Sequence, residues 1–163
     1  MTRPEPLVEV HCFALPVRLA AKSQQHFEEL MREFTLIAAS AEIDHSDGHV
    51  PSRLMQLVNL LVAQYGGLNS AAEQLLADAI DRDDELIEDH VLQVPASAGS
   101  ASQALSDMID EADDYCRQGR HLLTLASPPD CVAYRRWYLG EVIRQLDGGA
   151  PVPWPDSEQA QSL

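Results

Sequence analysis

The sequence predicts an α+β fold that is mainly α-helical, with two β-α-α units around a small central sheet. Five stretches place apolar residues at helical spacing. Two shorter stretches are rich in β-forming residues, and each of them ends at a proline. With 163 residues, of which 45% are apolar, the chain is long enough to form one domain with its own core.

The first half of the chain predicts one strand and two helices. Residues Leu7–Leu15 partly alternate between β-formers and polar residues, and Pro16 ends the run. A helix over Val17–Ala39 follows, with its apolar residues on one face. A second helix, over Pro51–Tyr65, begins at a proline and ends at Gly66–Gly67, as helices commonly do.

The next stretch predicts a third helix, a second strand and a fourth helix. The third helix begins at Ser70, which forms a capping-box pattern with Glu73. A second strand is expected over Leu86–Val94, and a fourth helix over Ala98–Arg117. We expect the two strands to share one sheet, because a lone strand leaves its backbone groups unpaired.

The last helix is expected over Ser127–Leu146. Ser127 would be its N-cap, Pro128 its first residue and Asp130 the capping-box acid. The short apolar run Leu122–Ala126 before it fits either a third strand or buried coil, because periodicity does not separate the two.

We expect one globular domain over residues 1–149 and an extended, proline-rich tail over 150–163. Phe27, Leu105 and Leu139 lie at the centre of the apolar faces of their helices. All three are therefore expected in the core.

The repeated order of elements raises the alternative of an internal duplication. Pro16 and His11 match Pro95 and His90 at an offset of 79, since 95 − 16 and 90 − 11 both give 79. Unrelated β-α-α units share a few identities by chance, so both explanations stay open. A duplication would give a pseudo-symmetric architecture with the two strands in the middle.

The composition excludes several classes of partner. The formal charge is −15, from 26 acidic and 11 basic residues, so the surface repels phosphate backbones and anionic membranes. The three cysteines lie far apart, which argues against a disulfide framework and favours a reducing cytoplasm. We expect no signal peptide, no membrane span, no nucleic-acid partner and no cofactor.

Two stretches that are rich in acidic residues or histidines are candidates for metal sites. His45, Asp47 and His49 have no standard zinc spacing, and Gly48 beside them is typical of a turn. The acidic run over residues 81–89 lacks the glycine and the ligand spacing of an EF-hand loop. Both are expected to be solvated connections, and no metal site is predicted.

No catalytic site is predicted either. The chain contains no G-x-S-x-G, Walker A, G-x-G-x-x-G or H-E-x-x-H motif. Histidines and carboxylates that are scattered through an acidic chain pair by accident, so a small-molecule enzyme is the weaker alternative.

The last helix carries the candidate interface. Tyr134 and Trp137 lie opposite the apolar face formed by Val132, Leu139, Ile143 and Leu146, and Glu141 and Arg144 complete this amphipathic surface. Large aromatic side chains and arginines dominate interface hot spots, so these four residues are expected to form an interface. The two rings are expected to be at least partly accessible in an isolated chain and to be covered in a dimer or a complex. The alternative is that the proline-rich tail folds back and covers the two rings, with Trp154 packed against them.

Arg135 and Arg136 lie at the edge of that apolar face. Their expected role is structural, in ion pairs with carboxylates of the fourth helix such as Asp113 or Glu111. The alternative is that they anchor a partner together with Trp137.

Three segments carry a resemblance to a known family: PLVEVHCFALPVRLAAKSQQHFEELMREFTLIA, DEADDYCRQGRHLLTLASPP and VAYRRWYLGEVIRQLDG. Together they resemble a family of uncharacterised actinobacterial proteins, which are found alongside the STAS-domain antagonists and GHKL-type kinases of partner-switching systems. The resemblance covers nearly the whole chain and implies signalling by association, without known catalytic residues.

The function expected from the sequence is therefore that of a non-enzymatic cytoplasmic regulatory protein, which binds another signalling protein or a second copy of itself. A degenerate GHKL-type ATP-binding protein is the first alternative. That fold needs an Asn-bearing helix and a D-x-G-x-G turn; Asn59 lies on the second helix, but the turn motif is missing.

Overall fold

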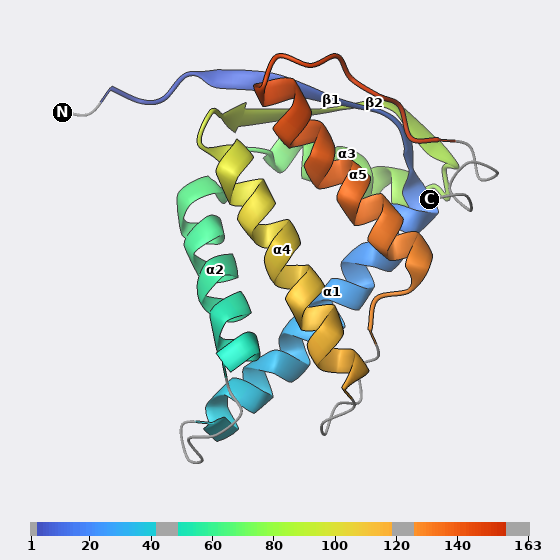
Figure 1. Ribbon diagram of the computed structural model, residues 1–163. Coiled ribbons are helices and arrows are strands. Elements are labelled where there is room, and N and C mark those ends of the chain that lie inside the picture. The colour runs from blue at the N-terminus through green and yellow to red at the C-terminus, as the bar shows by residue number, and fades with distance from the viewer. Residues whose placement is uncertain (1–2, 42–48, 119–125, 156–163) are drawn as a thin grey trace.

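The computed structural model describes residues 3–41, 49–118 and 126–155, and it is an α+β fold dominated by helices (Figure 1). The elements are β1 (Leu7–Pro16), α1 (Val17–Ala41), α2 (His49–Tyr65), α3 (Ser70–Asp81), β2 (Leu86–Pro95), α4 (Ala98–Arg117) and α5 (Pro129–Leu146). The fold class, both strands and all five helices are confirmed. No described helix is both long enough and apolar enough to cross a bilayer.

The two strands form one antiparallel sheet, as expected. Leu7 lies opposite Pro95, and Pro16 lies opposite Leu86, and only Ala14 and Glu88 interrupt the pairing between these ends. Each proline stands at a strand end, where the missing N–H interrupts no pairing inside the sheet.

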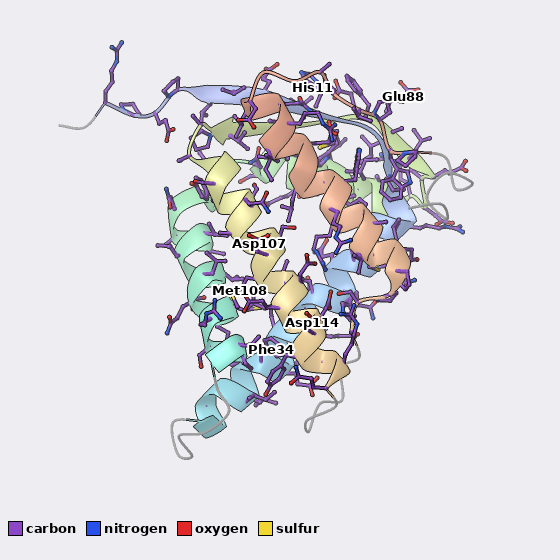
Figure 2. All side chains as sticks on the ribbon, in the orientation of Figure 1. His11, Phe34, Glu88, Asp107, Met108 and Asp114 are labelled. Carbon is purple, nitrogen blue, oxygen red and sulfur yellow. The ribbon has the colours of Figure 1, made fainter. Side chains whose placement is uncertain are left out.

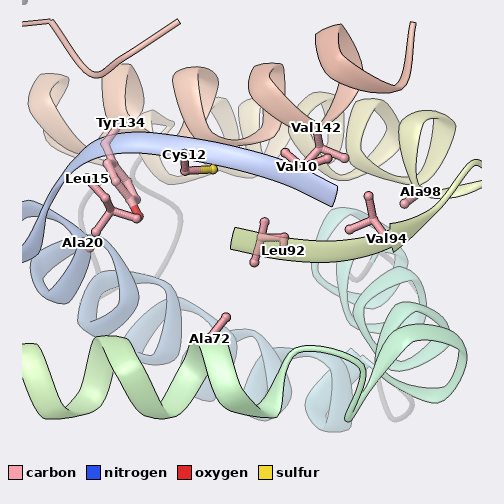
Figure 3. Packing of buried hydrophobic residues seen from close by; sticks show 10 residues of the cluster. All are labelled: Val10, Cys12, Leu15, Ala20, Ala72, Leu92, Val94, Ala98, Tyr134 and Val142. Carbon is pink, nitrogen blue, oxygen red and sulfur yellow. The ribbon is translucent and has the colours of Figure 1, made fainter. Parts of the chain in front are cut away.

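One face of the sheet is covered by helices, and this contact forms the first hydrophobic cluster. Val10 and Cys12 of β1 and Leu92 and Val94 of β2 point to the same face and are buried. In Figure 3, β1 and β2 lie between α5 and α3, and the side chains of Tyr134 and Ala72 reach toward the strands. This cluster joins the sheet to helices α1, α3, α4 and α5.

A second hydrophobic cluster joins α1, α2 and α4 farther from the sheet. Its buried members are Leu30, Phe34, Leu54, Met108, Ile109, Ala112 and Cys116. Phe27 and Leu105 pack against this cluster but are half-buried, and Leu139 of α5 is half-buried as well. All three residues therefore lie at the border of the core, whereas the sequence predicts them inside it.

Side-chain amides satisfy both free edges of the two-stranded sheet. The amide of Gln145 accepts from the His11 N–H and donates to the His11 carbonyl, both at 2.8 Å. The amide of Asn69 does the same at the other edge, where it accepts from the Gln93 N–H at 2.7 Å and donates to its carbonyl at 3.2 Å. Each amide thus stands in for one residue of a neighbouring strand.

Both predicted capping boxes are wrong, although the helices themselves are confirmed. The N-cap of α5 is Pro128, and the Ser127 hydroxyl donates to Asp113 at 2.7 Å instead. The N-cap of α3 is Asn69, and the Ser70 hydroxyl donates to the Gly67 carbonyl. In both places a tertiary or turn contact competes successfully for the serine.

The strand register does not support the duplication at the proposed offset. A two-fold relation would place His11 and His90 on one face of the sheet. His11 instead lies opposite Val91, whereas His90 lies opposite Cys12, so the two histidines point to opposite faces. The repeated order of elements is real, but these identities do not occupy equivalent positions.

Candidate functional site

The predicted docking face of α5 is covered by the chain's own tail. The tail crosses α5 and β1: the Trp154 N–H donates to the Phe13 carbonyl at 3.0 Å, and the Trp137 indole N–H donates to the Val152 carbonyl at 2.8 Å. The Trp154 ring lies 5.4 Å from that of Trp137 and 5.9 Å from that of Tyr134. The alternative in which the tail covers both rings therefore describes the structure.

Glu141 is completely buried at the centre of this contact. Its carboxylate pairs with Arg144 and accepts from the Gln145 amide at 2.9 Å and from the Val152 N–H at 3.0 Å. A buried carboxylate needs such partners, because each unpaired lone pair would be costly away from water. Glu141 thus fixes the tail to the helix.

The predicted accessibility of the face is wrong for Tyr134 and Glu141, which are buried. The wheel of an isolated helix places them opposite the apolar residues, but α5 is covered on two sides, by the sheet and by the tail. Trp137 and Arg144 remain partly exposed, so a role of these two in binding a partner stays a prediction.

Arg135 and Arg136 of α5 form ion pairs with α4, as the sequence predicts. Arg135 pairs with Asp110 and, at 3.2 Å, with Asp113, whose carboxylate also accepts from the N–H and hydroxyl of Ser127. Arg136 lies 3.5 Å from Asp110. Asp113 is buried and the Arg135 side chain is only 12% exposed, so this network joins α4 to α5 rather than anchoring a partner.

Titratable side chains also lie in the interior beneath α5. Burial raises the pKa of the Cys12 thiol to about 12, and it raises the pKa of the Tyr134 and Tyr138 phenols above their usual range. Burial lowers the pKa of His90, and the neighbouring Asp89 opposes this effect. These shifts keep all four groups neutral at pH 7, as suits a packed interior.

Neither the metal candidates nor the nucleotide candidate gains support. His45 and Asp47 lie outside the described residues, and His49 begins α2. Among the described residues, no group of three or more His, Cys, Asp or Glu side chains is placed to hold a metal ion. Asn59 lies on α2 with its side chain exposed.

The structure brings together a different candidate site, on a surface without charged residues. Residues 54–72 contain no Asp, Glu, Lys or Arg, and neither do residues 90–106. The first segment forms most of α2 and the turn into α3, and the second forms the end of β2 and the first half of α4. Helices α2 and α4 pack together, and these uncharged halves both lie at the sheet end of the molecule (Figure 1). We call this surface the uncharged face.

A pocket of about 160 Å³ opens on the uncharged face. It lies between α2, β2, α4 and α5, and its walls are mainly apolar, with Leu61, Leu68, Leu105, Leu139 and Val142 among the lining residues. The Tyr65 hydroxyl, also at the pocket, donates to Ser97 at 3.0 Å. The half-burial of Leu139 is explained by this opening.

Large apolar side chains are exposed on α2 and on the turn that follows it. Leu68 lines the pocket and is 39% exposed. Leu60 and Val62 are the sequence neighbours of the lining residue Leu61 and are 59% and 63% exposed, but they do not line the pocket themselves. An exposed apolar residue at the mouth of a pocket is typical of a protein-interaction site.

The sequence analysis does not predict this face, because helical periodicity shows which residues of one helix share a side and not where two helices leave an opening. The charge-free lengths of the two segments would have indicated it, since charge is depleted at the centre of interfaces.

Comparison of the chain with protein-family models, curated proteins and solved structures gives no match in any of the three.

Proposed function

We propose that this protein is a non-enzymatic cytoplasmic regulatory module that acts by binding another protein through the uncharged face. The observation that carries the proposal is the pairing of a small apolar pocket with exposed Leu60, Val62 and Leu68, on an otherwise strongly acidic chain. A monomer gains no stability by exposing these side chains, whereas an interface gains apolar contact area. The resemblance to proteins of partner-switching systems supports signalling as the context.

Site-specific photo-crosslinking in native cells tests the proposal. A photoreactive residue in place of Val62 is expected to join the chain to a distinct protein, which is then purified and tested for direct binding. The matched control carries the same residue in place of Gln25, which is exposed on α1, away from the uncharged face. The adduct at Val62 is expected to disappear when Leu68→Arg is added, because a charge at the pocket mouth opposes apolar docking.

The proposal fails if both positions give the same adducts, or if Leu68→Arg leaves the Val62 adduct unchanged. Either outcome would show that contact with the uncharged face is not specific.

A further inference from the structure

The pocket and the charges around it indicate what kind of segment fits the uncharged face. We propose, on the basis of the proposed function, that the partner presents an amphipathic basic helix. One of its apolar side chains enters the pocket, and its Lys or Arg side chains contact Glu73 and Glu5 at the rim.

The size of the pocket fits a single anchor side chain. A cavity of about 150 Å³ accommodates a benzene ring, and the pocket here has about 160 Å³. Its apolar wall, with Leu61, Leu139 and Val142, offers contacts to a leucine or phenylalanine side chain. Interfaces commonly place one such anchor in a desolvated pocket at their centre.

The rim of the uncharged face is acidic. Glu73 lies one turn after the pocket residue Asn69, and its N–H donates to the Asn69 carbonyl at 2.9 Å. Glu5 lies at the start of α4, where it accepts from the Ser97 N–H and hydroxyl, both at 2.9 Å.

These rim carboxylates are available to a cationic partner. Within the described part of the chain (Figure 2), neither Glu73 nor Glu5 forms an ion pair with a basic side chain. The total charge of −15 adds a long-range attraction for a basic segment.

The same charges disfavour a second copy of this chain as the occupant. In a two-fold dimer through the uncharged face, each acidic rim would meet another acidic rim, and the two chains would repel each other. A helix is the expected form of the partner segment because α2 and α4 pack side by side at the pocket, and an apolar helix face fits such a surface.

Synthetic peptides test the inference on the full-length protein. The probe is a peptide of about 15 residues, or about four helical turns, with leucines on one face and lysines on the other. Isothermal titration calorimetry compares it with a peptide in which glutamate replaces every lysine, and with a scrambled leucine–lysine peptide. We expect the basic amphipathic peptide to bind at least about tenfold more tightly than either of the others.

Matched variants locate the binding. Leu68→Arg is expected to weaken binding of the basic peptide by about tenfold or more. Leu75 on α3 has a similar exposed fraction and does not line the pocket, so Leu75→Arg is expected to leave the binding unchanged. Glu73→Lys is expected to weaken it and to reduce its dependence on salt between about 50 and 300 mM. Glu28→Lys on α1 makes the same change in net charge and serves as the control.

Several outcomes would overturn the inference. Equal loss in both leucine variants, or in both charge variants, would mean non-specific attraction to an acidic protein. A dimer in analytical ultracentrifugation that Leu68→Arg abolishes would identify a second copy as the occupant. If the crosslink at Val62 is specific but the lysine peptide does not bind, the proposed function stands and the basic helix is wrong.

Discussion

The Gln145 side chain binds both backbone groups of His11, accepting from its N–H and donating to its carbonyl at 2.8 Å each. This amide closes the outer edge of β1 and prevents a continuous row of unpaired backbone groups. Gln145 also donates to Glu141 at 2.9 Å, so one side chain connects the sheet edge, the buried carboxylate and α5. A two-stranded sheet without such closure is only marginally stable in water.

Gln145→Glu is expected to destabilise the fold by about 3 kcal/mol, measured by urea denaturation. The carboxylate has no N–H to donate, so the His11 carbonyl loses its partner and two acids face each other at Glu141. Gln56→Glu, an exposed position on α2, is the control and should stay within about 0.5 kcal/mol of the wild type. A similar small change for Gln145→Glu would show that the amide does not close the edge.

Arg144→Ala is expected to destabilise the protein more than Glu141→Gln does. Loss of Arg144 leaves the fully buried carboxylate without its ionic partner, at a cost of about 3 kcal/mol or more. In Glu141→Gln the arginine is left unpaired instead, but its partly exposed side chain still reaches water. Urea denaturation of both variants measures the difference, and the reverse order would contradict the proposed burial of charge.

A chain that ends at Gly149 is expected to expose Trp137. This variant and the full-length Trp154→Phe variant both keep Trp137 as the single tryptophan, since the chain has 2. Acrylamide should quench the fluorescence of Trp137 more strongly in the shortened chain, because the tail that binds its indole N–H is missing. The shortened chain should also lose about 2 kcal/mol of stability through lost apolar burial. Equal quenching would mean that the tail does not cover the ring.

The sequence predicts the helices and strands correctly, but it does not predict what covers the faces of each helix. Periodicity and prolines located both strands and all five helices, because local propensity and tertiary structure agree there. The predicted exposure of Tyr134 and Glu141 is wrong. A helix wheel shows which residues share a face, but it does not show that a tail 15 residues away covers that face. Helical spacing also places Leu61 on the apolar side of α2, but it does not show that this residue lines an open pocket.

The three cysteines are expected to be unreactive in the native protein. All are free and buried, and burial raises the pKa of Cys12 to about 12 and that of Cys116 to about 11, so little thiolate exists at neutral pH. Iodoacetamide followed by mass spectrometry should give no adduct in buffer and three adducts in denaturant. Rapid labelling of Cys12 in buffer would show that the contact between β1 and α5 opens readily.

The stability of the protein is expected to fall below about pH 6.5 because of His90. Its side chain is buried beside Tyr138, with a ring separation of 6.3 Å, and its Nδ1 has no hydrogen-bond partner in the described part of the chain. Burial disfavours the imidazolium and lowers the pKa of His90 below the ordinary value of 6.5, while Asp89 partly offsets this. Above that value both the folded and the unfolded states carry a neutral ring. As the pH falls toward the folded-state pKa, only the unfolded state takes up the proton, so folding is progressively disfavoured.

His90→Gln removes the titrating imidazole. It is expected to flatten the pH dependence of the unfolding free energy between about pH 7.5 and pH 5.5. A single titrating group contributes at most about 1.4 kcal/mol per pH unit to this dependence. His11→Gln is the matched control, because His11 lies on the opposite face of the sheet, partly exposed, with Asp89 3.0 Å away. The control should keep the wild-type fall in stability. If His90→Gln keeps the same slope as the wild type, protonation of the buried His90 does not govern the acid sensitivity of the fold.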